Sequence, residues 1–158
     1  MKICCFTGPR LHKLNYKNGE SDAACIRLKE RINKEIEKLY LRGFRVFISG
    51  MAEGVDIFCA EAVLSLKEIY NDMILEAVLP YNQTSRNADA RYRRIIQAAD
   101  SVIILQNQYS YDCFYNRNKY MVDKSDLLMA VYSQSGGTAY TIKYAAKCDK
   151  PIKILPQN

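Results

Sequence analysis

The stretch FRVFISGMAEGVD, residues 44–56, joins a β-branched and aromatic run to a glycine-containing turn and the start of a helical pattern. The apolar run ends at Ser49 and Gly50, and Gly54 stands directly before Val55 and Asp56. A strand, a glycine turn and a helix N-terminus in this order can direct backbone N–H groups toward an anion. The same residues also suit an ordinary βα turn, so a functional reading requires that other strand ends converge on this one.

The rest of the chain repeats the alternation of short apolar runs and amphipathic segments. We expect strands at residues 2–6, 44–49, 74–79, 101–105, 127–132 and 152–155. Helices are expected at about 22–42, 55–70, 88–99, 119–122 and 136–147, with residues 106–117 forming a surface loop or a cover over a site. Apolar strands separated by helices require a parallel sheet covered on both faces. The sequence therefore predicts one α/β domain over residues 1–158, doubly wound, mainly parallel and Rossmann-like.

Composition narrows the class of protein. Of the 158 residues, 49% are hydrophobic and 25% are charged, which are ordinary values for a globular domain. No apolar run approaches the ~20 residues of a membrane span and no secretion signal is evident, so a cytoplasmic protein without a membrane partner is expected. The six cysteines lack a C-x-x-C pair and only one histidine is present, so we expect buried thiols and no metal site. The net charge of +6 is compatible with a phosphate or nucleic-acid partner.

Glycine, hydroxyl and arginine residues follow several of the predicted strands. Doubly wound sheets bind ligands beyond the carboxyl ends of their strands. Glycine lets the backbone approach oxygen atoms, Ser and Thr donate hydrogen bonds, and helix N-termini add a positive partial charge. No G-x-G-x-x-G motif or Walker lysine is present, so it is this convergence that favours a phosphate-bearing ligand. The candidate ligand-binding residues at the strand ends are Thr7, Gly8, Arg10, Ser49, Gly50, Glu53, Gly54, Asp56, Pro80, Tyr81, Gly136, Gly137 and Thr138.

Each of these candidates also has a structural explanation. Arg10 suits a forked contact with phosphate and equally a surface ion pair. Glu53 can accept a hydrogen bond from a ribose hydroxyl or can carry a solvated charge. Asp56 is at a position where helix capping is the commoner role, and capping is also the alternative for Ser49 and Thr138.

Five segments resemble one known family in their order and spacing. They are CFTGPR at residues 5–10, SGMAEGVD at 49–56, VLPY at 78–81, RNKYMVDKSDLLMAVY at 117–132 and SGGTAYTIKYA at 135–145. SGMAEGVD resembles the SGxAxGxD turn in the Rossmann-like domain of the DNA-processing protein DprA. The whole set resembles the YpsA-like family, a former domain of unknown function within the SLOG superfamily. The resemblance implies a Rossmann-like fold with a pocket for a nucleotide or nucleotide-derived ligand, and it adds Arg117, Asn118 and Asp123 to the pocket wall.

The SLOG superfamily also contains the LOG enzymes, which are phosphoribohydrolases. Their PGGxGTxxE motif places a glutamate near the glycosidic bond. The matching residues here are 137–141, with Thr141 where the glutamate would be. A hydroxyl cannot replace a carboxylate as general acid or base near neutral pH, so the resemblance disfavours LOG-type hydrolysis by this machinery. Glu53 or Asp56 could supply a carboxylate instead, which leaves catalytic activity open.

Three functions are compatible with these observations. The first is a sensor or carrier that binds a nucleotide-type ligand at the carboxyl edge of the sheet. The alternatives are a hydrolase of a nucleotide N-glycosidic or phosphate bond, and a DprA-like single-stranded DNA-binding module. A nucleic-acid partner ranks below a small molecule because no helix-turn-helix and no aromatic–basic interleaving are evident. Related Rossmann-like domains often form dimers, so a homo-oligomer is a further expectation, whereas no specific cofactor is predicted.

Overall fold

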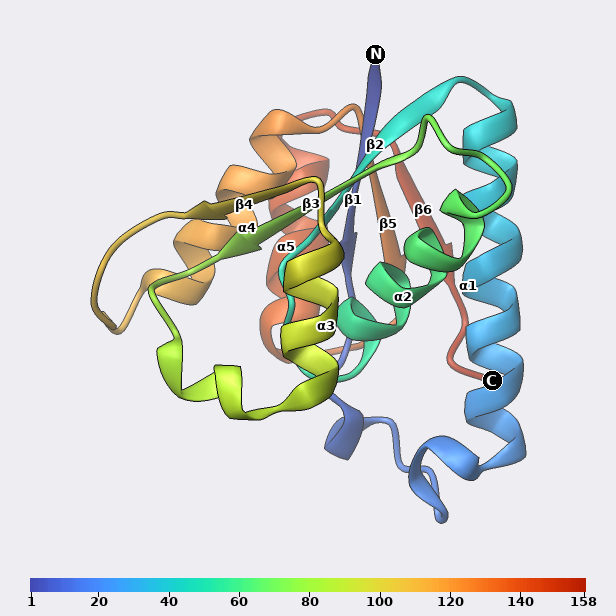
Figure 1. Ribbon diagram of the computed structural model, residues 1–158, viewed down its shortest axis with the longest axis horizontal. Coiled ribbons are helices and arrows are strands. Elements are labelled where there is room, and N and C mark those ends of the chain that lie inside the picture. Colours follow the sequence, from blue (N-terminus) through green and yellow to red (C-terminus); the bar gives the residue numbers. More distant parts are fainter.

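Six parallel strands form the central sheet of the computed structural model, which describes residues 1–158 (Figure 1). The strands are β1 (Lys2–Thr7), β2 (Phe44–Ser49), β3 (Ile74–Leu79), β4 (Ser101–Ile104), β5 (Leu127–Val131) and β6 (Ile152–Leu155). Their order is β4-β3-β2-β1-β5-β6, and every neighbouring pair is parallel. The predicted α/β, Rossmann-like fold is confirmed, and the sheet is parallel throughout.

Five α-helices cover the two faces of the sheet (Figure 1). One face carries α1 (Ala23–Leu41), α2 (Val55–Lys67) and α3 (Ala90–Ala98), and the other carries α4 (Cys113–Lys124) and α5 (Gly136–Lys147). Three short 3₁₀ turns lie in the loops: η1 (Leu11–Lys13), η2 (Gly19–Ser21) and η3 (Thr84–Ala88). Right-handed crossovers place α1 to α3 on one face while the chain moves from β1 out to β4, and α4 and α5 on the other face as it passes to β5 and then to β6. The strand order therefore reverses between β1 and β5.

The larger hydrophobic core lies between the sheet and helices α1 to α3. It receives from α1 the side chains that recur every three or four residues, namely Cys25, Leu28, Ile32, Ile36 and Leu39. A smaller core on the opposite face packs Ile48, Val78 and Leu128 against Met121 and Val122 of α4. All six cysteines are free thiols, and five of them are buried. No helix has both the length and the apolar character that crossing a membrane requires.

Helix α4 begins earlier than the sequence pattern indicated. Residues 113–117, part of the predicted loop 106–117, form its first turns. The buried residues of α4 are Cys113, Arg117, Met121 and Val122. Because a charged residue occupies one of these positions, the first half of the helix lacks the apolar stripe that identifies helices in a sequence. The correction matters because this half of α4 lies against the carboxyl edge of the sheet.

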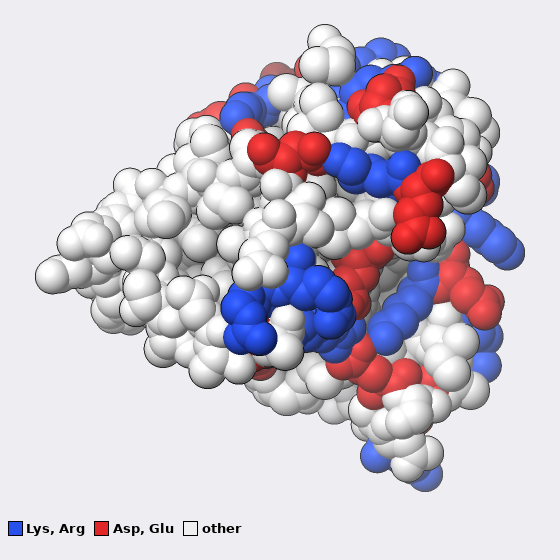
Figure 2. Space-filling view, viewed as in Figure 1, with Lys and Arg blue, Asp and Glu red and all other residues white.

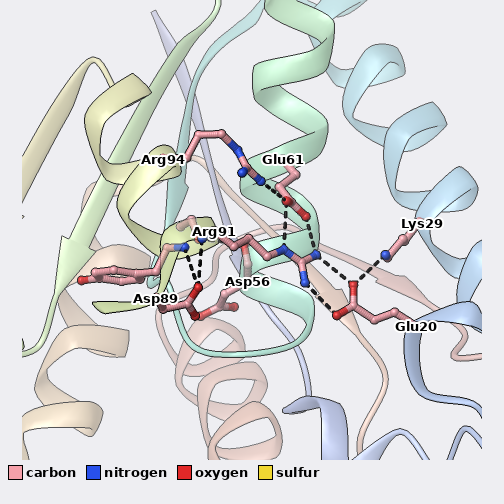
Figure 3. A network of polar contacts seen from close by, with 9 residues as sticks. Glu20, Lys29, Asp56, Glu61, Asp89, Arg91 and Arg94 are labelled. Atoms are coloured by element: carbon pink, nitrogen blue, oxygen red, sulfur yellow. Dashed lines mark hydrogen bonds and ion pairs between the residues drawn. The ribbon is translucent and has the colours of Figure 1, made fainter. Parts of the chain in front are cut away.

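A network of ion pairs joins four elements beside the turn that follows β2 (Figure 3). Arg91 at the start of α3 donates to Glu61 of α2 at 2.9 and 2.5 Å and to Glu20 of η2 at 2.7 and 2.8 Å. Lys29 of α1 donates to the same Glu20 at 2.7 Å. Asp89 caps α3 by accepting a hydrogen bond from the backbone N–H of Arg91 at 2.9 Å. These contacts hold η2, α1, α2 and α3 in one fixed arrangement.

Candidate functional site

A cavity of about 340 Å³ opens at the carboxyl ends of β1 and β5, where the strand order reverses. Doubly wound folds bind ligands at such a switch point, because the loops that leave the two strands separate toward opposite faces of the sheet. Most of the wall comes from the loop after β1, the first turns of α4, and Ser133, Ser135, Gly137 and Thr138. We call this the switch-point cavity.

The structure brings half of the predicted site residues together around the switch-point cavity. Segments that lie more than a hundred residues apart in the chain meet there, because β1 pairs with β5 in the register Thr7 to Ala130. The predicted residues in its wall are Thr7, Gly8, Arg10, Asp56, Arg117, Asn118, Gly137 and Thr138.

The other predicted residues lie outside this wall. Pro80 is buried, and Tyr81 packs edge-on against Tyr109 with ring centroids 5.8 Å apart. Asp123, near the C-terminal end of α4, accepts a hydrogen bond from Tyr144 Oη at 2.6 Å. Glu53 is exposed and lines a smaller adjoining cavity.

Gly136 also lies outside the wall, although the next residue, Gly137, is part of it. Its φ of +75° lies in the left-handed region, and a Cβ there would come within 2.9 Å of Lys13 Nζ. Ser49, Gly50 and Gly54 belong to the end of β2 and the turn after it, and they do not line the cavity. Of this segment, only Ala52 and Asp56 are part of the wall.

The glycine turn after β2 interlocks with the loop after β1. Gly54 has a φ of +93°, and a Cβ there would lie 2.6 Å from Leu11 N and 2.7 Å from Pro9 O. A Cβ on Gly8 would lie 2.4 Å from Val55 Cγ1. The two loops can therefore pack this closely only because each has a glycine at the contact. The backbone N–H of Val55 donates to Pro9 O at 3.3 Å. The glycines therefore position the loop that carries Arg10.

The first turn of α5 supplies backbone donors to the cavity. Ser135 is the N-cap residue, and its side chain makes no capping hydrogen bond. The backbone N–H groups at the start of a helix have no partner within it, and they carry the positive end of the helix dipole. Gly137 and Thr138 in this turn line the cavity, so a twelve-residue helix presents its N-terminus to the cavity.

Three cationic side chains reach the cavity, and none of them forms an ion pair: Arg10, Lys13 and Arg117. Arg117 is only 5% exposed, and its Nη1 donates to Gly50 O at 2.7 Å. Its Nε donates to Asn118 Oδ1 at 2.9 Å. Burial lowers the pKa of Arg117, which means that its charge is incompletely solvated. The Asp56 carboxyl group opposes this shift, and an anionic ligand would add to its effect.

Asp56 is the one carboxylate in the wall of the switch-point cavity, and it is 7% exposed. Its Oδ2 accepts a hydrogen bond from the backbone N–H of Ala52 at 3.2 Å, and Ser49 Oγ donates to the Asp56 carbonyl oxygen at 2.9 Å. Burial raises the pKa of Asp56, while Arg117 is the strongest of the influences that oppose this shift. A buried carboxyl group of this kind can accept a hydrogen bond from a ribose hydroxyl or can hold a proton.

Aromatic side chains from α4 and the residues before it complete the wall. Tyr111, Phe114 and Tyr115 line the cavity, and the Tyr115 ring lies 4.8 Å from that of Tyr140. Their flat faces can stack on a base. Phe114, Tyr115 and Lys13 were not predicted from the sequence. The sequence signal for these residues was the close spacing of the aromatic residues in 109–115. Because the segment lacks apolar periodicity, it was predicted to be a loop.

The glutamate position of the LOG motif takes no part in the site. Thr141 is 3% exposed, and its hydroxyl donates to Gly137 O at 2.7 Å within α5. This hydrogen bond to the preceding turn occupies the side chain. The structure also holds no group of three or more His, Cys, Asp or Glu side chains arranged for a metal ion.

Known proteins resemble this chain over most of its length. A family model described as the YspA SLOG family matches residues 4–155. A UPF0398 protein of Bacillus cereus (strain G9842) is 31% identical over 157 residues, which cover 93% of this chain and 84% of that protein. A UPF0398 protein of Halalkalibacterium halodurans is 26% identical over 155 residues, covering 93% of this chain and 82% of the relative.

A solved structure shows the same fold. DNA processing protein A from Helicobacter pylori, whose structure is described for its single-stranded DNA binding mode, matches 99% of this chain with a TM-score of 0.66 and 18% sequence identity. The match spans 66% of that chain, just under two thirds of its length. Similarity at this level of identity concerns the fold alone. The family assignment rests on the family model and on the relatives above 30% identity, and by both criteria the chain belongs to the YpsA family of the SLOG superfamily.

Proposed function

We propose that this protein binds a nucleotide or nucleotide-derived ligand in the switch-point cavity and acts as a sensor or carrier. The observation that carries the proposal is the convergence of unpaired cations and a helix N-terminus on one cavity. Arg10, Lys13 and the first turn of α5 all reach it, and no carboxylate neutralises either side chain through an ion pair. Donors of these kinds bind phosphate in many unrelated proteins.

The cavity also has the size and the polar groups that a nucleotide requires. Its volume of about 340 Å³ falls within the ~300–1,000 Å³ of small-molecule sites. With the phosphate at α5 and Arg10, the carboxyl group of Asp56 is available to a ribose hydroxyl. Tyr111, which is 85% exposed, and Tyr115 offer aromatic faces to the base.

Asp56 favours a hydrolase as the second candidate among small-molecule functions. A carboxyl group with a raised pKa can act as a general acid, and this one lines the cavity. The LOG-type position is occupied by Thr141, which is bonded within its own helix. Any hydrolysis would therefore use a different arrangement of residues from that of the LOG enzymes.

The experiment is a thermal-unfolding screen with nucleoside monophosphates, ADP-ribose and NAD. A ligand present at 100 times its Kd stabilises the native state by ~2.7 kcal/mol, which raises Tm by roughly 8 °C in a domain of this size. We expect at least one nucleotide to give such a shift and Arg10→Ala to weaken its binding about tenfold. Arg27→Ala removes the same charge from the exposed side of α1 and serves as the control.

If no nucleotide stabilises the wild type, or if the two arginine variants behave alike, the proposal is wrong. Chromatography of the ligands after incubation separates the two small-molecule functions. A sensor or carrier returns each nucleotide intact, whereas a hydrolase releases the base or phosphate.

Single-stranded DNA binding is a further candidate, favoured by the similarity to DNA processing protein A. The polynucleotide backbone would use the same arginines that a mononucleotide uses. Its distinguishing property is the dependence of affinity on salt.

A further inference from the structure

A second, smaller cavity adjoins the switch-point cavity on the side of β3. Its volume is about 140 Å³, and it shares Arg10, Phe114 and Arg117 with the larger cavity. Gln83 and Arg86, which follow β3, close its far side. We call it the arginine cavity. With Ala52, which also lines both, these shared residues make the two cavities direct neighbours.

The arginine cavity gathers three guanidinium groups that have no carboxylate partner. Arg10, Arg86 and Arg117 are absent from every ion pair of the structure, whereas Arg91 and Arg45 each bind a carboxylate. Burial lowers the pKa of Arg117, the Asp56 carboxyl group opposes this shift, and the positive charges of Arg10 and Arg86 lower the pKa further. Three like charges around one cavity are costly unless an anion joins them.

Two of these arginines are held in place by the glycine turn after β2. Arg86 Nη1 donates to Met51 O at 2.6 Å, and Arg117 Nη1 donates to Gly50 O at 2.7 Å. Arg86 also stacks over the ring of Tyr92 at 4.1 Å. A guanidinium carries five N–H donors, so each arginine keeps free donors after binding the backbone. The turn thus orients both side chains before any ligand arrives.

Gln83 adds an unpaired acceptor to the same cavity. Its Oε1 is buried and receives no hydrogen bond, and it is the one buried side-chain nitrogen or oxygen of the structure in this state. Leaving a buried acceptor unpaired is unfavourable, so a donor on the ligand would be stabilising. A sugar hydroxyl is such a donor. Glu53, which also lines the cavity, is exposed and forms no ion pair with the three arginines.

We infer that the arginine cavity binds a second phosphate of the same ligand, so that the ligand class is a phosphorylated sugar or nucleotide with two phosphates separated by a sugar. The inference deepens the proposed function and rests on it. The first phosphate lies at α5 and the second lies between Arg86 and Arg117, while Arg10 borders both cavities and can contact either phosphate. A sugar hydroxyl donates to Gln83. A nucleoside bisphosphate and a short single strand of DNA share this chemistry.

The test compares AMP with adenosine 3′,5′-bisphosphate by isothermal titration calorimetry. The wild type is expected to bind the bisphosphate at least about tenfold more tightly, as one or two charge-assisted hydrogen bonds would provide. Arg86→Gln is expected to remove this preference and to leave the affinity for AMP within about twofold. The matched control is Arg93→Gln, because Arg93 is exposed on α3, donates to a backbone carbonyl (Asn87 O at 2.7 Å) and lines neither cavity.

A second variant covers the case in which Arg86→Gln fails to fold. Gln83→Glu keeps the size of the side chain and adds a negative charge that competes with the second phosphate, so it too should abolish the preference. Equal wild-type affinities for the two ligands would overturn the inference and leave the proposed function intact. Equal losses for AMP and the bisphosphate in Arg86→Gln would overturn it as well. If no nucleotide binds the wild type, both proposals are wrong.

A third arm identifies the source of the second phosphate. A five-residue oligothymidylate is titrated at the same salt concentration as the bisphosphate, with wild type and Arg86→Gln. Tighter, Arg86-dependent binding of the oligonucleotide assigns the subsite to a polynucleotide backbone, and tighter binding of the bisphosphate assigns it to a small nucleotide. If Arg86→Gln binds both the oligonucleotide and the bisphosphate as tightly as the wild type does, the inference of a second phosphate subsite is overturned.

Discussion

Gly54 illustrates how one residue without a side chain positions the charges of the site. Its φ of +93° is unfavourable for other residues, and its backbone packs directly on Pro9 and Leu11. Arg10 lies between those two residues. The geometry of the cationic wall therefore depends on close contact between two loops that the sequence separates by more than forty residues.

Gly54→Ala should destabilise the protein by roughly 2–4 kcal/mol, because it combines backbone strain with a collision between the new Cβ and Leu11 N. The matched control is Gly43→Ala. Gly43 has a φ of +100°, but nothing lies within 4 Å of its Cβ position, so strain alone should cost about 1 kcal/mol. Urea denaturation gives both values. Equal losses in the two variants would show that the contact with the loop after β1 contributes nothing.

The residues of the glycine turn after β2 were predictable from the sequence, but the role of each residue was not. A glycine turn after an apolar run predicts that the backbone N–H groups of the turn bind an anionic ligand directly. In the structure Gly50 O and Met51 O instead accept hydrogen bonds from Arg117 and Arg86, so the turn orients arginines. Those partners come from other segments, and their approach depends on tertiary packing that a local pattern does not contain.

At the scale of elements, the strands were predicted well and α4 poorly. The six strand predictions match the structure to within one residue at each end, because buried parallel strands are almost continuously apolar. The start of α4 lacked such a pattern, since its inner surface lines a polar cavity instead of the core. A helix that faces a ligand site loses the periodicity by which helices are recognised.

The Arg91 network couples the position of η2 to α2 and α3, and it has a defined pH dependence. Hydrogen bonds from Arg91, and to a smaller extent from Lys29, lower the pKa of Glu20 from 4.5 to about 2, against the effect of burial. The folded protein therefore favours the ionised carboxylate. The stabilisation is fully present above pH ~4.5 and is lost as the pH falls toward 2.

Glu20→Gln should lower the free energy of unfolding at pH 7 by on the order of 1 kcal/mol, because the pairs are partly exposed. The difference from wild type should shrink between pH 5 and pH 2.5, and urea denaturation across this range measures it. Glu30→Gln, at an exposed and unpaired position on α1, is the control. A deficit in Glu20→Gln that stays constant with pH would show that the ion pairs do not stabilise the fold.

For the whole molecule, the order of the strands determines where the site lies, and it could not be read from the sequence. Each parallel pair joins distant segments, as in the contact of Cys4 with Leu127, so local patterns give no register between them. The sequence therefore indicated which strand ends carry polar residues. In the structure, the strand order reverses between β1 and β5, and the carboxyl ends of these two strands enclose the switch-point cavity.

The chain carries a net charge of +6. Figure 2 shows basic side chains interleaved with acidic ones over the helical face, while the end formed by β4 and the loop after it is almost free of charge. A single strand of DNA would therefore find no continuous basic track on this face. Its phosphates would be bound chiefly by the arginines at the carboxyl edge of the sheet.

This distribution predicts a shallow salt dependence for any binding of single-stranded DNA. Two or three phosphate contacts, made by Arg10, Arg86 and Arg117, correspond to a slope of log K against log[salt] of roughly −1.5 to −2. Fluorescence anisotropy of a labelled oligothymidylate between 50 and 300 mM salt measures the slope. Arg10→Ala should reduce it by about 0.7, and Arg27→Ala should leave it unchanged. A slope steeper than about −4 that is indifferent to Arg10 would mean that dispersed surface charge binds the DNA, and that the cavities at the switch point have no part in it.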